Sequence, residues 1–159
     1  YEVRVDTAFA DVIAACAAPQ PDRPETWINP DIQLLFGELF RQGRAHSVEC
    51  WQGDTLVGGL YGLAVGGVFC GESMFSRQTD ASKVALVHLC ARLFAAKFTL
   101  LDAQFHNPHL EQFGIYLVPQ RTYVQELKKL RDATPDFLLR EKPLSASGLI
   151  AAYLENRRK

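Results

Sequence analysis

Three closely spaced strand patterns occupy the middle of the sequence. Residues 46–52, 55–64 and 67–70 have the character of strands, and the dipeptides Gly53-Asp54 and Gly66-Gly67 separate them. Short connections of this kind, rich in glycine, are typical of antiparallel hairpins. We therefore predict an antiparallel meander, and the remaining segments must pack around it.

The second of these strands contains three glycines, Gly58, Gly59 and Gly62. A strand that only fills a core has no need of them, because each glycine costs conformational entropy and has no side chain to pack. We therefore predict that another group comes close to the backbone of this strand.

Helices and further strands are expected on both sides of the meander. Apolar side chains at helical spacing predict helices that begin after Asp6-Thr7 and at Asn29-Pro30, and Asp80 is expected to cap a long apolar helix over 81–96. Residues 71–79 are interpreted as a loop, and 98–105 as a central strand. The other expected elements are a short helix over 109–113, a strand over 115–120, and helices over 122–130 and 148–156. This order indicates an α+β or mixed-sheet fold.

Composition limits the class of protein. The chain has 159 residues, 48% hydrophobic and 22% charged, with a net charge of −1, which suits one domain and gives no global sign of nucleic-acid binding. It has no apolar run of 18 residues, and we expect no secretory signal and no membrane span. Because the first residue is Tyr1, we expect that upstream sequence is missing. Cys16, Cys50, Cys70 and Cys90 form no C-x-x-C pair, so we expect reduced thiols in a cytoplasmic protein and no metal site.

Glu72 is the first candidate functional residue. It stands between Phe69 and Met74, and a carboxylate among apolar side chains is desolvated unless a cation pairs with it. It could therefore bind a cationic ligand group, and the alternative is a loop carboxylate that caps a helix. The neighbouring Ser73 lies in "GESMF", which is not the G-x-S-x-G pattern of a nucleophilic serine.

Asp102 and Gln104 form a second candidate pair. Residues two apart on a strand share one face, and two polar side chains on so apolar a strand need partners. Glutamine offers a neutral acceptor oxygen and two donors, and Asp102 can orient its neighbour. The alternative is a hydrogen-bonded pair that only holds loops in place. The four histidines have no recognisable metal spacing.

Seven stretches resemble the bacterial leucyl/phenylalanyl-tRNA–protein transferases. Together they extend from about residue 5 to about residue 130 in the family's order. The matching stretches are "TWI" (26–28), "GRAHSVECW" (43–51), "LVGGLYG" (56–62), "VFCGESMFSR" (68–77), "ASKVAL" (81–86), "LLDAQ" (100–104) and "HLEQFG" (109–114).

The resemblance implies a fold of the GCN5-related acyltransferase type over residues 1–132, with 133–159 as a C-terminal extension packed on that domain or trailing from it. It implies an enzyme that moves leucine or phenylalanine from the 3′ end of aminoacyl-tRNA to the α-amino group of a protein beginning with arginine or lysine. The product is a bacterial degradation signal. Because the donor ester is already activated, the resemblance implies neither a metal nor a coenzyme.

The resemblance also implies roles for individual residues. Gln104 would accept a hydrogen bond from the attacking amine, Asp102 would polarise and orient Gln104, and Glu72 would meet the cationic side chain of the acceptor. The glycines of 58–62 would leave room for the aminoacyl-adenosine end of tRNA, and the alternative is close packing of a helix over them. The implied substrate-binding positions beside Glu72 are Trp27, Phe69, Gly71, Ser73, Met74 and Leu101.

Three other functions remain open. A relative could transfer the aminoacyl group from tRNA to a small molecule, and the absence of the upstream domain usual in the family favours this. A degenerate relative could bind peptides without catalysis, which the presence of Asp102, Gln104 and Glu72 argues against. A coenzyme A acyltransferase is disfavoured, because the loop before Ala81 lacks the expected glycine-rich form.

Overall fold

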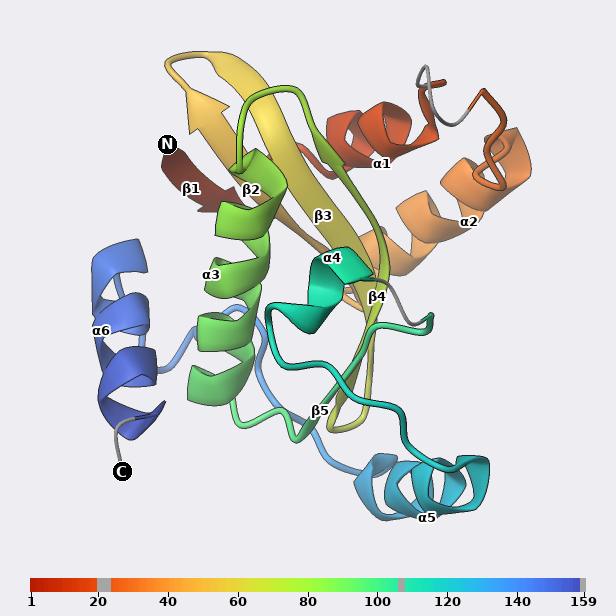
Figure 1. The fold of residues 1–159 in the computed structure, drawn as a ribbon, viewed down its shortest axis with the longest axis vertical. Helices are drawn as coiled ribbons and strands as arrows, with labels where there is room; N and C mark the ends of the chain where they lie inside the picture. Colours follow the sequence, from red (N-terminus) through yellow and green to blue (C-terminus); the bar gives the residue numbers. More distant parts are fainter. Residues whose placement is uncertain (20–23, 106–107, 158–159) are drawn as a thin grey trace.

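Five strands form one sheet in the order β1-β2-β3-β4-β5. In the computed structural model, which describes residues 1–19, 24–105 and 108–157, β1 to β4 pair antiparallel and β5 pairs parallel to β4 (Figure 1). The strands are β1 Glu2–Val5, β2 Ala45–Gln52, β3 Thr55–Val65, β4 Val68–Ser76 and β5 Leu100–Asp102. The predicted α+β class, the meander and the mostly antiparallel sheet are confirmed, and the architecture is consistent with an acyltransferase fold of the GCN5-related type.

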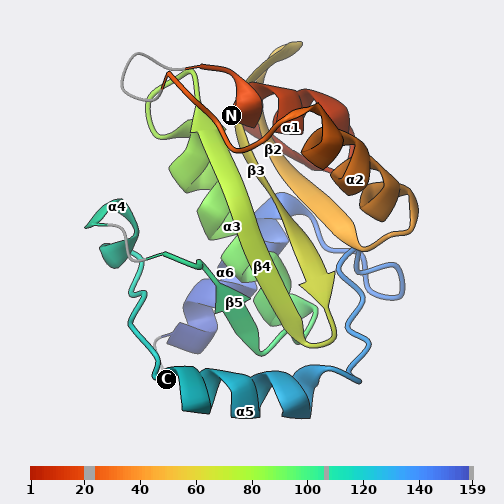
Figure 2. The ribbon, with the colours of Figure 1, turned by 90° about the vertical axis from the view of Figure 1, so that its right-hand side faces the viewer.

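Helices cover both faces of the sheet. Helices α1 and α2 pack on one face, while α3 packs on the other face and carries α6 on its outer side (Figure 1). Figure 2 shows β5 beside β4 at the edge of the sheet, with α5 across its end. The described helices are α1 Phe9–Ala17, α2 Pro30–Arg41, α3 Ala81–Ala95, α4 Pro108–Glu111, α5 Gln120–Leu130 and α6 Ala146–Arg157.

Strand β4 is longer than the sequence predicted. The loop expected over 71–79 is wrong for residues 71–76, which continue the strand. These residues pair with β3, so that Phe75 lies opposite Gly59 and Ser76 lies opposite Gly58. The polar residues of this stretch indicated a loop. It is a strand because it pairs with β3, and local sequence does not show that pairing.

The two strands expected after α3 are the largest errors. Only Leu100–Asp102 of the predicted central strand 98–105 is a strand, and it lies at the sheet edge. Gln104 has a φ of 62°, which turns the chain away from the sheet. The strand expected over 115–120 is absent from this described segment, where Tyr116 and Leu117 are 80% and 78% exposed.

Of the two predicted helix caps, the one at Asn29 is confirmed and the one at Asp80 is wrong. The Asn29 side chain accepts a hydrogen bond from the Ile32 N–H at 2.9 Å, as expected of a cap residue. At α3 the Ser76 hydroxyl, not the Asp80 carboxylate, accepts from the Ser82 N–H, at 3.2 Å. Asp80 instead pairs with Lys83 at 2.7 Å.

The glycines of β3 make room for the protein itself. A Cβ at Gly58 would lie 2.4 Å from the Cβ of Ala81, at the first turn of α3. A Cβ at Gly62 would lie 2.4 Å from the Phe69 ring. Close helix packing is therefore the correct interpretation at Gly58. The expectation that these glycines leave space for the end of tRNA is wrong, because protein atoms fill that space.

A buried carboxylate that the sequence did not single out holds the start of α1. Glu49 on β2 is fully buried and accepts hydrogen bonds from the Thr7 and Ala8 N–H groups, both at 3.0 Å. The Ser47 hydroxyl also donates to it at 2.8 Å. These donors compensate for the removal of the charge from water, and a negative charge suits the positive end of a helix.

The C-terminal residues contribute to the core. Phe137 is 3% exposed, and its ring stacks on His46 at a centroid distance of 4.1 Å and on Phe69 at 5.2 Å. Arg92 on α3 donates to the Phe137 carbonyl at 2.9 Å. Leu149 of α6 is also buried. The described residues after 133 therefore pack on the sheet and on α3.

Candidate active site

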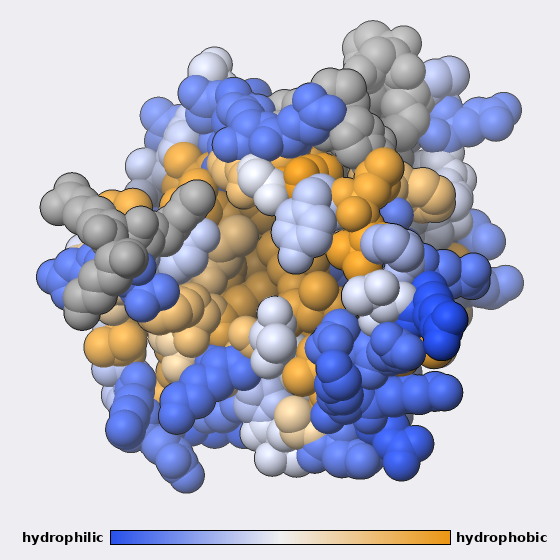
Figure 3. All heavy atoms as spheres, turned by 60° about the horizontal axis from the view of Figure 1, so that its bottom comes forward, coloured by the Kyte–Doolittle hydropathy of each residue, from blue (hydrophilic) through white to orange (hydrophobic). Residues whose placement is uncertain are grey.

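Two adjoining cavities lie where β4 meets β5. The first, which we call the acidic cavity, has a volume of about 820 Å³ and contains Asp102 and Gln104. The second, which we call the apolar cavity, has a volume of about 230 Å³ and reaches α3. Turned so that its lower end comes forward, the molecule shows an apolar hollow bordered by hydrophilic side chains (Figure 3). The residues that line both cavities are Glu72, Leu101, Ala103, Phe113 and Ile115.

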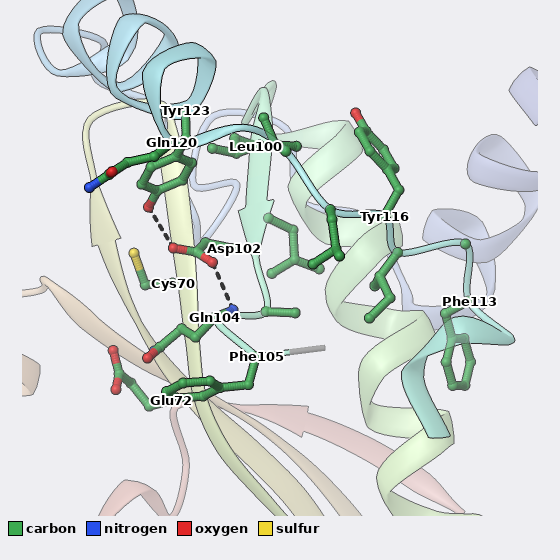
Figure 4. A pocket seen from close by; sticks show the side chains of 16 residues that line it. Cys70, Glu72, Leu100, Asp102, Gln104, Phe105, Phe113, Tyr116, Gln120 and Tyr123 are labelled. Atoms are coloured by element: carbon green, nitrogen blue, oxygen red, sulfur yellow. Dashed lines mark hydrogen bonds between the residues drawn. The ribbon is translucent and has the colours of Figure 1, made fainter. Parts of the chain in front are cut away.

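Asp102 ends β5 and occupies the centre of the acidic cavity. It lies opposite Cys70 in the parallel pairing with β4. Its Oδ1 accepts a hydrogen bond from the Gln104 backbone N–H at 2.7 Å, and its Oδ2 accepts one from the Tyr123 hydroxyl at 2.5 Å (Figure 4). Because both oxygens are engaged from different elements, the orientation of this carboxylate is set by the protein.

Gln104 reaches the same site by a turn and not along a strand. The expectation that Asp102 and Gln104 share a strand face is wrong, because β5 ends at Asp102. The left-handed backbone at Gln104 brings its side chain over β4, where Nε2 donates to the Gly71 carbonyl at 3.1 Å. With its Nε2 bound there, the amide keeps Oε1 as an acceptor.

Glu72 sits at an irregularity of β4. The pairing of β3 with β4 shifts between Tyr61 and Gly62, and Glu72 is the extra residue of the bulge. A bulge changes the direction of a side chain, and here the unpaired residue of the bulge, Glu72, lines both cavities. Glu72 therefore lies within a strand, so the alternative of a helix-capping loop carboxylate is wrong.

The charges of the site are negative. Burial raises the pKa of the Glu72 carboxyl, the charge of Asp102 raises it further, and the nearby Gln104 amide partly offsets both. Among the described residues that line the two cavities, none is a lysine or an arginine. The site can therefore attract a cationic group that would pair with these carboxylates.

Cys70 also lines the acidic cavity, but as a thiol. Burial raises its pKa to about 11, and the carboxylates of Asp102 and Glu72 act in the same direction. Since the thiolate is the nucleophile, Cys70 is not placed to act as one at neutral pH. All four cysteines lie in the described part of the chain, and each has its thiol.

The predicted pocket residues fall into three groups. Gly71, Ser73, Met74 and Leu101 line the apolar cavity together with leucines of α3. Phe69 is fully buried in the core behind it and stacks on Phe137. Trp27 lies before α2, is 52% exposed, and is not among the lining residues of either cavity.

Tyr123 is a residue of the site that the sequence did not indicate. Its hydroxyl contacts Asp102 from α5, and that hydrogen bond, together with burial, raises the pKa of the tyrosine, which stays protonated at neutral pH. No local pattern in the sequence marks this residue, because it lies 21 positions from Asp102 on a different element.

The described residues contain neither a cluster of metal-ligating side chains nor a helix that could span a membrane. Within residues 1–19, 24–105 and 108–157, no three metal-ligating side chains gather into a group that could hold an ion. In the same ranges, every helix is too short or too polar to cross a membrane.

Known proteins resemble this chain over most of its length. The profile of the family described as leucyl/phenylalanyl-tRNA protein transferase matches residues 1–128. The chain belongs to this family. Curated relatives that carry the family's name include those of Phenylobacterium zucineum, 60% identical over 137 residues, and Hyphomonas neptunium, 58% identical over 137 residues. Each alignment covers 86% of this chain, and 62% and 53% of the respective relatives.

One relative extends the likeness towards the C-terminus. The protein of Afipia carboxidovorans is 49% identical over 153 residues, which is 95% of this chain and 67% of that relative. The first relatives are covered over about three fifths of their own length or less.

Proposed function

We propose that this chain catalyses transfer of leucine or phenylalanine from aminoacyl-tRNA to the α-amino group of a protein that begins with arginine or lysine. The observation that carries the proposal is that the acidic cavity, which contains Gln104 and Asp102, adjoins the apolar cavity and shares Glu72 with it. Such a site can hold the two substrates on either side of the bond that forms.

The apolar cavity suits the side chain of the transferred amino acid. Met74, Leu86, Leu89 and Leu101 line it, with Phe113 on the side shared with the acidic cavity. A pocket of aliphatic and aromatic side chains selects by shape, and it discriminates against β-branched side chains only modestly. This fits a donor that carries either leucine or phenylalanine.

The acidic cavity suits the acceptor. It holds Glu72 and Asp102, and none of its described lining residues is a lysine or an arginine. A basic N-terminal residue would gain a charge-assisted hydrogen bond from Glu72. The same charges would repel phosphates, so we place the phosphates of tRNA outside this cavity and only its aminoacyl-adenosine end near it.

The chemistry follows from the positions of these groups. The neutral α-amine attacks the ester carbonyl carbon, a C–N bond forms, and the bond between that carbon and the ribose 3′ oxygen breaks. The proton lost by the amine ends on the 3′ oxygen of the leaving tRNA. The Oε1 of Gln104 accepts a hydrogen bond from the amine. A glutamine is too weak a base to drive the step alone, so placement of the amine beside the ester supplies much of the rate.

The proposal also covers the setting of the reaction. Residues 1–132 would form the transferring domain, and residues 133–157 would pack on it. The ester of aminoacyl-tRNA is already activated, so the step as written consumes no coenzyme. Aminoacyl-tRNA is a substrate of the cytoplasm, and the cysteine thiols agree with a reducing compartment.

Transfer of labelled leucine or phenylalanine from tRNA to peptides tests the proposal. We expect transfer to a peptide that begins with arginine, little transfer to a matched peptide that begins with aspartate, and a large fall in the rate of transfer in Asp102→Ala. Glu72→Gln should raise KM for the arginine peptide about 10-fold, since a hydrogen bond to a charged partner contributes roughly 1.5–3 kcal/mol. Discharge of the tRNA without peptide product would instead indicate a small-molecule acceptor. A protein that neither binds nor discharges aminoacyl-tRNA would contradict both functions.

A further inference from the structure

A chain of hydrogen bonds joins three elements across the site. The Tyr123 hydroxyl of α5 donates to Asp102 Oδ2 at 2.5 Å, and the Gln104 N–H donates to Asp102 Oδ1 at 2.7 Å. Gln104 Nε2 then donates to the Gly71 carbonyl of β4 at 3.1 Å. Asp102 therefore contacts Gln104 through its backbone N–H.

The backbone of Gln104 needs such support. Its φ of 62° lies in the left-handed region, which residues other than glycine seldom adopt. This conformation costs on the order of 1 kcal/mol. The Asp102 carboxylate compensates for this cost, because it accepts a charge-assisted hydrogen bond from the Gln104 N–H. The direction of the Gln104 side chain thus depends on where the Asp102 carboxylate is held.

Tyr123 is the group that holds this carboxylate from its other side. It lies in the first turn of α5, a helix with no buried residue. The far end of α5 is joined to the turn between β3 and β4, where Gly67 N–H donates to the Leu130 carbonyl at 2.8 Å. Both ends of α5 are therefore anchored, and its first turn is anchored at the site (Figure 4).

We propose that Tyr123 is a positioning residue for the transfer reaction, which fixes the Asp102 carboxylate and, through it, the strained backbone of Gln104. The inference rests on the proposed function. A positioning role differs from a purely structural role. It requires that the Tyr123 hydroxyl act through Asp102, and that its loss change the rate of transfer more than the binding of the donor.

Tyr123→Phe tests this, since it removes the hydroxyl alone. We expect kcat to fall between about 10- and 100-fold, because misplacing a reacting group by about 1 Å costs on the order of 100-fold. KM for aminoacyl-tRNA should stay within about twofold, because the Tyr123 hydroxyl is bonded to Asp102 and Tyr123 does not line the apolar cavity proposed for the donor side chain. Tyr1→Phe is the matched control: it removes another tyrosine hydroxyl donor, to the Thr79 carbonyl at 2.7 Å, at an exposed position.

A double-mutant cycle separates the two roles. In an Asp102→Ala background, Tyr123→Phe should reduce the remaining rate by less than about twofold, because its partner is already gone. An equal loss in both backgrounds, or a kcat for Tyr123→Phe within about twofold of the parent protein, would overturn the proposal.

The Gln104 amide supplies a measurement that needs no activity. Tyr123→Phe should shift the Gln104 amide resonance in an NMR spectrum and speed its hydrogen exchange several-fold, whereas Tyr1→Phe should leave both unchanged. An unaltered Gln104 amide would refute the positioning role. A parent protein that transfers nothing while the amide responds as expected would instead refute the proposed function.

Discussion

Replacing Phe137 with alanine measures how strongly the C-terminal segment belongs to the fold. The ring is 3% exposed and lies between the rings of His46 and Phe69, with that of Phe98 edge-on at 6.2 Å. Removing a buried phenylalanine side chain costs about 3–5 kcal/mol, and the additional loss of ring stacking puts the expected value in the upper half of that range. For a chain of this length, such a loss lowers Tm by roughly 8–20 °C.

Urea unfolding followed by circular dichroism would measure the change. We expect the midpoint to fall without a change of slope, because the native state keeps its surface while losing stability. Phe105→Ala is the matched control, since that ring is 81% exposed and its removal should change stability by less than about 0.5 kcal/mol. A loss below about 1 kcal/mol for Phe137→Ala would refute the reasoning, because residues 133–157 would then lie on the domain without contributing to its core.

Three further changes test separate parts of the structure. Gly58→Ala should destabilise the protein by about 1–3 kcal/mol in urea unfolding because its Cβ would meet Ala81, whereas Gly37→Ala, with open space at its Cβ, should be neutral or stabilising. Tyr61→Phe should raise stability by about 1 kcal/mol, because the buried Tyr61 hydroxyl has no hydrogen-bond partner among the described residues; a loss of stability would contradict this. The pKa of Glu72 is raised by burial above its ordinary 4.5, so its contribution to stability is lost as pH rises through the folded-state value. Glu72→Gln should therefore raise Tm at pH 7 but not at pH 4, and an equal gain at both pH values would exclude this cause.

Much of the fold could be predicted because its signals are local. The two turns at Gly53-Asp54 and Gly66-Gly67 correctly joined β2 to β3 and β3 to β4. Asn29 capped its helix as expected, since a cap depends only on residues three positions apart. The failures came where a partner far along the chain decided the outcome, as when pairing with β3 extended β4 through the segment expected to be a loop.

The candidate site divides in the same way. Short motifs singled out Glu72, Asp102 and Gln104, and the structure brings these three together around one cavity. The sequence could not show that Gln104 turns out of the strand, because the left-handed backbone there is held by the Asp102 carboxylate. It also gave no sign of Tyr123, which reaches Asp102 only after α5 has folded across the end of the sheet.

The sequence alone determined the residue types of the site and the family to which the chain belongs, because both are carried by short stretches of the chain. Only the tertiary structure decided what those residues contact. The bulge that places Glu72 in both cavities, the packing of Ala81 into the space at Gly58, and the hydrogen bond from Tyr123 to Asp102 each join positions distant in sequence. Such contacts depend on how strands and helices pack, and neither hydrophobic periodicity nor local propensity records that.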